Sequence, residues 1–359
     1  MLRVSNPPNP WDSVHAEWLG DPPPARLEVF EERARSILSE NDSPDIGFRW
    51  SVNPYRGCFN ACSYCYARPT HEYLGFGAGT DFERKIVVKV NAAELLRREL
   101  SRRSWKGEAI AFSGNTDCYQ PLEAVYGLTR RCLEVCSELG NPVHLITKGA
   151  LVRRDTDLLT SMARRMDVSV FVSIPFSDDA MARLVEPGAS PPSQRFETLA
   201  ILTRAGIPTG VGVAPVIPGL TDSQVPEILA RARAAGAQDA FYQALRLPGA
   251  TLPVFQERIA RAFPQRAAKI AHAIQAMRGG RWNDPRFGDR MRGSGPRWAA
   301  IETLFRTEYR RLGFGERRVG WKRAGSPDAP AGTPIAPPPR PAQASLFDGG
   351  DDEEGSETG

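Results

Sequence analysis

The sequence lacks several features, and each absence excludes a class of protein. No apolar run in its 359 residues approaches the roughly 20 residues that a membrane-spanning helix needs. Only four histidines and a single Cys-x2-Cys pair are present, which argues against the common four-ligand zinc sites. No secretory signal precedes the six cysteines, so a disulfide framework is not expected. We therefore expect a cytoplasmic protein with reduced cysteines and no membrane partner.

What the sequence does contain is a close set of three cysteines, Cys58, Cys62 and Cys65, spaced Cys-x3-Cys-x2-Cys. Three thiolates can hold three irons of a cubane [4Fe-4S] cluster and leave the fourth iron open to a substrate or cofactor. A cluster held by four cysteines mainly transfers electrons instead. The spacing therefore indicates chemistry at iron, with a zinc site as the weaker alternative.

Short apolar runs alternate with amphipathic segments from Phe48 onward, which is typical of repeated strand–helix units. The pattern predicts an α/β fold whose parallel, curved sheet forms a partial (βα)6 barrel, with sites at the C-terminal ends of the strands. It also predicts a short helix from Arg26 to Leu38. The predicted strands cover residues 48–52, 108–113, 142–146, 168–174, 209–216 and 240–246, and the predicted helices cover 92–103, 122–139, 155–166, 194–205 and 222–235.

The cysteine loop, followed by an aromatic residue, resembles the signature of the radical S-adenosylmethionine (SAM) superfamily. Within it, the chain is similar to the branch that contains spore photoproduct lyase and proteins labelled DNA repair photolyase-like. The resemblance implies a [4Fe-4S] cluster and SAM as cofactors, an electron donor such as flavodoxin or ferredoxin, and reductive cleavage of SAM to a 5′-deoxyadenosyl radical that abstracts hydrogen. It runs from about residue 45 to 247 and rests on residues 53–58, 115–121, 145–148, 186–187, Arg195 and 214–222.

The resemblance also implies residues that hold SAM. Backbone carbonyls beside Gly114 and Asn115 would accept hydrogen bonds from the SAM amino group, because a glycine lets the backbone approach a ligand closely. Lys148 and Arg195 would bind its carboxylate, and Ser173 would bind the same carboxylate or the ribose. Each assignment has a plainer alternative. The Gly114 segment would be an ordinary turn at a strand end, Lys148 a solvated charge and Ser173 a loop cap. Arg195 would form an ion pair with a nearby glutamate.

Tyr64, Tyr66 and Cys118 are the candidate catalytic residues. The resemblance implies that the two tyrosines beside the last cluster cysteine, and a cysteine near the active site, handle the radical. The weak S–H bond of Cys118, which we expect to face the active site, would return a hydrogen atom to the product. The alternatives are tyrosines that only pack around SAM and a cysteine that is a small buried hydrophobe. We expect Cys132 and Cys136 to pack in the core.

Charge is distributed unevenly along the chain. Residues 258–323 contain seventeen Lys and Arg against five acids, and Arg alternates there with Gly and aromatic residues. Guanidinium groups contact phosphates and aromatic rings stack on bases, so this segment indicates a nucleic-acid partner. A solvated basic helical domain with core aromatics is the alternative.

The C-terminal tail cannot build a core, because it is first rich in Pro, Ala and Gly and then acidic. Its segment from Gln343 to Phe347, Gln-Ala-Ser-Leu-Phe, resembles the pentapeptide with which bacterial repair proteins bind the DNA sliding clamp. We therefore predict four parts: an N-terminal extension (1–44), a radical SAM core (45–250), a basic helical region (251–323) and a disordered tail (324–359) with a clamp-binding motif.

These observations favour a radical SAM enzyme that acts on a nucleic-acid base in DNA repair or modification. One alternative is a radical SAM enzyme that acts on a protein or small molecule. A second alternative is a non-enzymatic metal-binding nucleic-acid module.

Overall fold

The computed structural model describes residues 3–11 and 25–315. Residue contacts divide the chain into two units after Ala329, and all described residues belong to the first unit. The predicted disordered tail with its clamp-binding motif, and the last residues of the predicted basic region, lie outside the described residues. The boundaries of the four predicted parts stay predictions.

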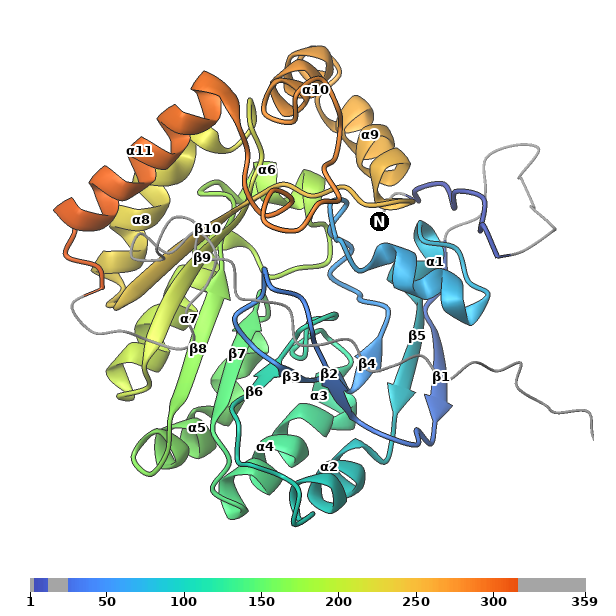
Figure 1. The fold of residues 1–359 in the computed structure, drawn as a ribbon, viewed down its shortest axis with the longest axis vertical. Helices are drawn as coiled ribbons and strands as arrows, with labels where there is room; N and C mark the ends of the chain where they lie inside the picture. The colour runs from blue at the N-terminus through green and yellow to red at the C-terminus, as the bar shows by residue number, and fades with distance from the viewer. Residues whose placement is uncertain (1–2, 12–24, 316–359) are drawn as a thin grey trace, which may run out of the picture. The chain divides into compact units, whose positions relative to one another are not determined.

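A seven-stranded sheet forms the centre of the fold, in the order β10-β9-β8-β7-β6-β3-β2 (Figure 1). Its six parallel strands are the six that the sequence predicts, which confirms the α/β fold with a curved parallel sheet. The antiparallel β2 (Leu38–Glu40) is added at the β3 edge. The six strands are β3 (Trp50–Val52), β6 (Ile110–Phe112), β7 (Val143–Thr147), β8 (Val168–Ser173), β9 (Thr209–Val216) and β10 (Asp239–Ala244).

Helices follow the strands and bury their apolar faces against the sheet, as the predicted strand–helix repeat requires (Figure 1). The predicted helix at 122–139 is interrupted, because Gly127 has a φ of 60° between a short first turn and the main helix. The helices are α2 (Ala92–Leu100), α3 (Glu123–Tyr126), α4 (Leu128–Glu138), η2 (Ala150–Asp155), α5 (Thr156–Ala163), α6 (Asp179–Val185), α7 (Pro192–Arg204), η3 (Asp222–Gln224) and α8 (Val225–Ala234).

A second, three-stranded sheet in the order β1-β5-β4 was not predicted. The predicted helix from Arg26 to Leu38 is wrong, because β1 pairs in parallel with β5 along its whole length and β2 pairs with β3. Tertiary pairing thus outweighs the helix propensity of this Glu- and Arg-rich segment. The sheet comprises β1 (Glu28–Glu32), β4 (Tyr55–Arg56) and β5 (Lys85–Lys89), with η1 (Arg68–Leu74) and α1 (Thr80–Arg84) between the last two.

The C-terminal region adds α9 (Thr251–Ala262), α10 (Ala267–Ala276) and α11 (Gly295–Arg311). Trp298, Phe305 and Tyr309 are buried and join the same core cluster as β9 and β10. Between α10 and α11 runs a nonhelical segment, residues 282–292, that we call the strap. None of the helices in the described ranges is long and apolar enough to cross a membrane.

Candidate active site

The three cysteines of the loop between β4 and η1 line one cavity of about 240 Å³ at the C-terminal ends of the parallel strands. Burial raises the pKa of the Cys58 thiol to about 12, and it also raises the pKa of Cys62 and Cys65. A buried thiol therefore stays protonated until a metal supplies the positive charge that stabilises its thiolate. Three such thiols on one cavity wall fit a metal cluster.

Within the described residues, no three His, Cys, Asp or Glu side chains are gathered as they would be around one metal ion. A cubane offers a separate iron to each thiolate, so its ligands need not converge on one point.

The cysteine loop is held in place by buried polar side chains. Arg68 is fully buried, and its Nε and Nη2 donate to the Cys62 carbonyl at 3.0 and 2.9 Å. Nη2 also pairs with Glu83 at 2.6 Å. Gly188 lies against the loop so closely that a Cβ there would come within 1.9 Å of the Phe59 carbonyl oxygen. The loop is therefore fixed by its surroundings before any cofactor binds.

Lys148 and Ser173, predicted at the ends of two strands, both line the cavity. The Lys148 ammonium donates to Ser173 Oγ at 2.8 Å and stands 4.0 Å from Glu186 Oε1. Ser173 Oγ in turn donates to the Ala214 carbonyl at 3.1 Å. This arrangement places an ammonium and a hydroxyl at the cavity wall, where a carboxylate can bind both.

Arg195 does not line the cavity. It is buried behind Ser173, donates to the Ser173 carbonyl at 3.0 Å, and pairs with Glu186, the alternative that the sequence left open. The Tyr64 hydroxyl also donates to Glu186. Burial raises the pKa of Glu186, and Arg195 partly offsets this effect. We call Glu186, Arg195, Lys148 and Tyr64 the inner cluster.

Gly114 and Asn115 follow β6 and line the cavity as predicted. The Gly114 carbonyl accepts a hydrogen bond from the Tyr66 hydroxyl at 2.7 Å, and the Asn115 amide donates to Asn53 Oδ1 at 2.8 Å. Ser113 reaches this turn with a positive φ of 70°. Tyr66 thus connects the cysteine loop directly to the turn that would hold the SAM amino group.

Asp117 is a functional candidate that the sequence reasoning missed, although it lies inside the quoted segment 115–121. Its carboxylate accepts from Asn60 Nδ2 at 2.8 Å, from Thr147 Oγ1 at 2.6 Å and from the Lys148 amide at 2.7 Å. The cysteine loop and the end of β7 are therefore tied to one carboxylate, which makes Asp117 a positioning residue.

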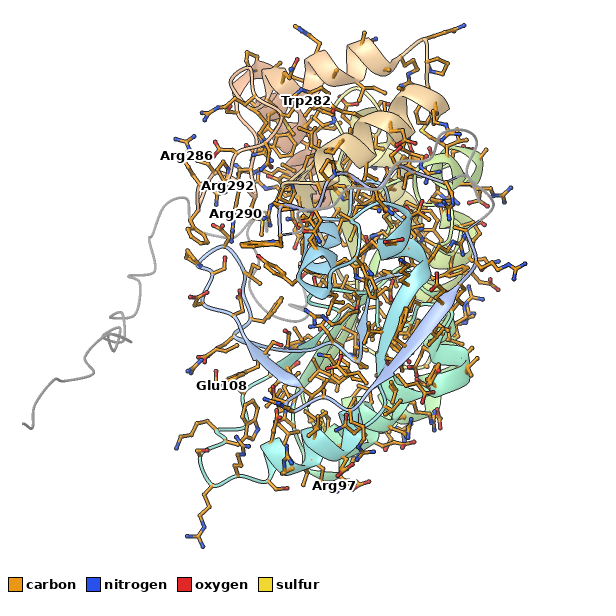
Figure 2. The ribbon with its side chains drawn as sticks, turned by 90° about the vertical axis from the view of Figure 1, so that its right-hand side faces the viewer. Arg97, Glu108, Trp282, Arg286, Arg290 and Arg292 are labelled. Atoms are coloured by element: carbon orange, nitrogen blue, oxygen red, sulfur yellow. The ribbon has the colours of Figure 1, made fainter. Side chains whose placement is uncertain are left out.

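The strap and the end of β10 complete the cavity. The sequence indicates the strap only as part of a basic segment, and it does not place Arg246 at the site. Met291 lines it, and its sulfur accepts from Gln243 Nε2 at 3.0 Å. Arg246 lines it beside Tyr66, with 5.7 Å between the guanidinium and the ring centre. Arg290 pairs with Asp45, which fastens the strap to the N-terminal side of the cavity. Figure 2 shows Arg286, Arg290 and Arg292 along one side of the molecule.

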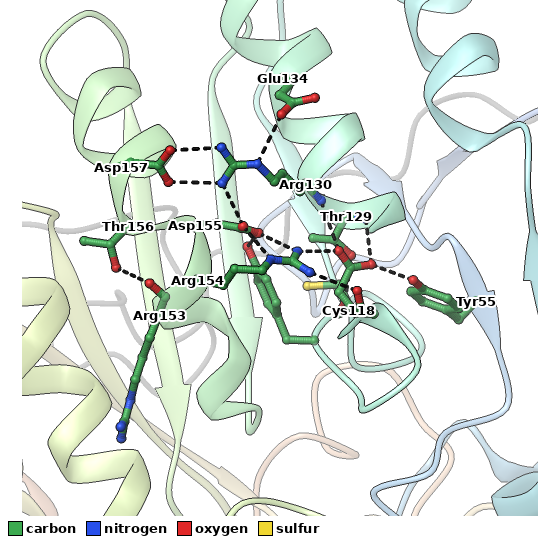
Figure 3. A network of polar contacts seen from close by, with 12 residues as sticks. Tyr55, Cys118, Thr129, Arg130, Glu134, Arg153, Arg154, Asp155, Thr156 and Asp157 are labelled. Atoms are coloured by element: carbon green, nitrogen blue, oxygen red, sulfur yellow. Dashed lines mark hydrogen bonds and ion pairs between the residues drawn. The ribbon is translucent and has the colours of Figure 1, made fainter. Parts of the chain in front are cut away.

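Cys118 lies elsewhere than predicted. Its side chain is buried in the core cluster that includes Cys132 and Cys136, and it is not part of the cavity lining. Its carbonyl accepts from Thr129 Oγ1 at 2.6 Å, in the polar network shown in Figure 3. The chain turns after Ser113 so that Asp117 faces the cavity and Cys118 faces the helices. The core prediction for Cys132 and Cys136 is confirmed.

A curved parallel sheet with a three-cysteine loop and a cavity at its strand ends defines the class of an α/β iron–sulfur protein. The chain belongs to the radical SAM superfamily, whose family model matches residues 52–232. Proteins of this superfamily use a [4Fe-4S] cluster and SAM, and Cys58, Cys62 and Cys65 lie in the matched segment. The predicted superfamily and cofactors are therefore confirmed.

Curated relatives come from bacteria, an archaeon and viruses. An uncharacterized protein of Mycobacterium tuberculosis is 41% identical over 242 residues, which cover 67% of this chain and 71% of the relative. An uncharacterized protein of Methanocaldococcus jannaschii is 28% identical over 55% of this chain and 71% of the relative. A protein of Pseudomonas phage M6 named radical SAM Nalpha-GlyT isomerase is 29% identical over 60% of this chain and 43% of its own length.

Solved structures with the same fold include spore photoproduct lyase. The complex of that lyase with dinucleoside spore photoproduct gives a TM-score of 0.53 at 14% identity, over 79% of each chain. A variant of the same lyase gives a TM-score of 0.54 at 14% identity, over 84% of this chain and 86% of the lyase. At this identity, the likeness establishes the shared fold.

Proposed function

We propose that the chain is a radical SAM enzyme that acts on a base of a nucleic acid, in repair or modification. The observation that carries the proposal is the composition of one cavity. Its lining holds the three cluster cysteines, Lys148 and Ser173, and also Met291 from the arginine-rich strap.

The chain's own residues fit both cofactors. Cys58, Cys62 and Cys65 would hold the [4Fe-4S] cluster, and the pair of Lys148 and Ser173 would bind the SAM carboxylate. The turn at Gly114 would approach the SAM amino group, with Tyr66 fixing its carbonyl. When bound, cluster and SAM supply a 5′-deoxyadenosyl radical to the cavity. Arg195 acts only through Ser173 and Glu186.

The cavity edge supports a nucleic-acid substrate. Arg246 lines the cavity next to Tyr66. Its burial and the charge of nearby Arg290 lower the pKa of its guanidinium. On the strap, Arg292 is exposed and Phe287 is 60% exposed, while the exposed Arg286 pairs with Asp284 and Asp289. Guanidinium groups and an exposed ring beside a reactive cavity suit phosphates and bases.

Two partners extend the proposal. Radical SAM enzymes need a reductant, for which we propose a small redox protein of the flavodoxin or ferredoxin type. The tail motif from Gln343 to Phe347 would bind the DNA sliding clamp, with Leu346 and Phe347 filling an apolar pocket. Binding of the intact tail to the clamp, and its loss in Leu346→Ala/Phe347→Ala, tests this partner. Failure of the wild-type tail to bind rejects it.

The test of the activity is anaerobic. Reconstituted protein is mixed with dithionite and SAM, and 5′-deoxyadenosine is measured by chromatography with duplex DNA, with RNA and with neither. We expect 5′-deoxyadenosine in each case, a higher rate with one nucleic acid, and none from Cys62→Ala. Equal rates in all three mixtures would instead favour the alternative substrate, a protein or small molecule. Absence of iron and sulfide from the wild-type protein would reject the enzyme altogether.

A further inference from the structure

A second hollow lies beside the active-site cavity, and we call it the basic groove. It has a volume of about 620 Å³ and runs between the connection from β1 to β2 and the paired strands β4 and β5. Arg33 and Arg35 come from the connection, while Arg56 and Lys89 come from the paired strands. Gly114 and Asn115 line both hollows, so the groove meets the cavity at the turn proposed to hold SAM.

Among the described residues, two cations of the groove form no ion pair, although the Glu32 carboxylate lines the same groove. Arg56 and Lys89 are both half-buried, and in the described ranges neither side chain makes a hydrogen bond or an ion pair. Two fully buried arginines of the fold, Arg68 and Arg195, are each bound to a carboxylate, and the buried Arg278 is bound to four backbone carbonyls. Arg56 and Lys89 have neither kind of partner among the described residues.

The surrounding acids do not neutralise the pair. Burial and the charge of Arg56 lower the pKa of Lys89, and the opposing effects of Glu32 and Glu99 are smaller. The Glu99 carboxylate already accepts from the Ile37 and Leu38 amides at 3.1 and 2.9 Å. Arg33, which also lines the groove, forms an exposed ion pair with Glu94, with 3.2 Å between Nη2 and Oε2.

Two neighbouring cations in a partly dehydrated groove repel each other, and each loses hydration. A phosphate oxygen that binds both removes the repulsion and supplies strong charge-assisted hydrogen bonds. Polar side chains on the remaining wall, Ser39, Ser51 and Asn53, can bind further oxygens. Thus the charge and the polar lining both match an anion with several oxygens.

We propose that the basic groove binds a backbone phosphate of the nucleic-acid strand whose base enters the active-site cavity. The shared residues Gly114 and Asn115 then separate the phosphate from the reacting base. This inference rests on the proposed function, because it assigns the substrate of that site a second point of contact. It assigns Arg56 and Lys89 a binding role and no part in the chemistry.

The experiment measures binding of a fluorescently labelled single-stranded DNA of mixed sequence by anisotropy, using the reconstituted full chain over a series of salt concentrations. Arg56→Gln and Lys89→Gln should each weaken binding about tenfold at low salt. Each should also reduce the slope of log affinity against log salt by about 0.7, the value for one phosphate contact on a single strand. Arg56→Lys, which keeps the charge, should retain the slope.

Arg103→Gln is the matched control, because Arg103 is exposed and lies outside the groove, and it should leave affinity and slope unchanged. Slopes of both groove variants equal to that of wild type would overturn the inference while leaving the proposed function intact. No binding of DNA or RNA by the wild-type chain would instead reject its nucleic-acid substrate. Inorganic phosphate is also titrated against the bound strand and against bound mononucleotides. If it displaces both at the same concentration, the groove is a site for free phosphate, and the inference is overturned.

Discussion

Two clusters built around buried carboxylates differ in whether their hydrogen bonds are complete. The outer cluster consists of Glu123, Asp155, Arg130 and Arg154. Figure 3 labels the last three. Glu123 accepts from the Tyr55 hydroxyl at 2.5 Å and pairs with Arg154 at 2.7 Å, and Asp155 pairs with both arginines.

The inner cluster keeps spare donor capacity. Glu186 is paired with Arg195, but in the part of the chain that the structure describes the Lys148 ammonium makes one hydrogen bond, to Ser173. An ammonium has three N–H donors, so a ligand in the cavity can take the others. The difference teaches that a closed cluster holds the fold together, whereas an open one next to a cavity is available for recognition.

Breaking the outer cluster should have the largest effect on stability. Glu123→Ala leaves the buried Tyr55 hydroxyl without its acceptor and removes one of the two carboxylates that bind Arg154, so the free energy of unfolding should fall by about 3–5 kcal/mol. Denaturant unfolding measures this. Glu134→Ala removes an exposed partner of Arg130 and should cost less than about 1 kcal/mol. A loss as small as this in Glu123→Ala would contradict the structural role.

Breaking the inner cluster should make stability depend on pH. Arg195→Gln removes the charge that offsets the burial of Glu186, so the folded-state pKa of this carboxyl rises further above its unfolded value of about 4.3. The cost of ionising Glu186 is absent below the unfolded pKa and grows as pH rises toward the folded pKa. The free energy of unfolding should therefore fall as pH rises above about 4.3, and it should fall more steeply in Arg195→Gln than in wild type.

Thermal or denaturant unfolding at several pH values measures this dependence. The control is the double variant Glu186→Gln/Arg195→Gln, which has no carboxyl to titrate and should show a flatter profile. A rise in stability with pH in Arg195→Gln alone would show that Glu186 is not the buried acid that Arg195 neutralises.

Changing the open member of the inner cluster should affect the ligand more than the fold. Lys148→Met removes the donor at the cavity wall, and the dissociation constant for SAM should rise 10- to 100-fold, about 1.4–2.8 kcal/mol. The free energy of unfolding should change by less than about 1 kcal/mol. Equilibrium dialysis of anaerobically reconstituted protein gives the first quantity. Lys106→Met, at an exposed lysine, is the control, and an equal loss of SAM binding there would contradict the assignment.

The smallest effect is expected at Cys118, whose carbonyl lies in the outer network rather than at the cavity. Cys118→Ala should lower the free energy of unfolding by about 1 kcal/mol. Formation of 5′-deoxyadenosine and release of product should match wild type. Selective loss of product release would restore the hydrogen-donor role that the sequence predicts.

The sequence allows the sheet to be predicted because each central strand is an apolar run bounded by polar turns. It does not reveal the second sheet. Strand β1 is exposed, β4 is only two residues long, and both pair with β5, which is distant from them in sequence. Gly127 ends α3 through a positive φ, which the periodicity of residues 122–139 conceals.

The candidate site divides in the same way. The cysteine spacing and the strand-end positions of Lys148 and Ser173 are local signals, and these residues line the cavity. Arg246 and Met291 reach it from β10 and the strap, which no local pattern indicates. The side on which Cys118 lies depends on the turn after Ser113, a backbone detail that side-chain pattern does not encode.

The pairing of Asp45 with Arg290 has a consequence for biogenesis. The two residues are 245 positions apart, and a ribosome that adds about 5–20 residues per second needs roughly 10–50 s to synthesise the chain between them. During that interval the cysteine loop has already been made, while the strap has not. We therefore expect the nascent chain to present its thiols to the cellular machinery that delivers iron and sulfide before the last part of the chain is in place.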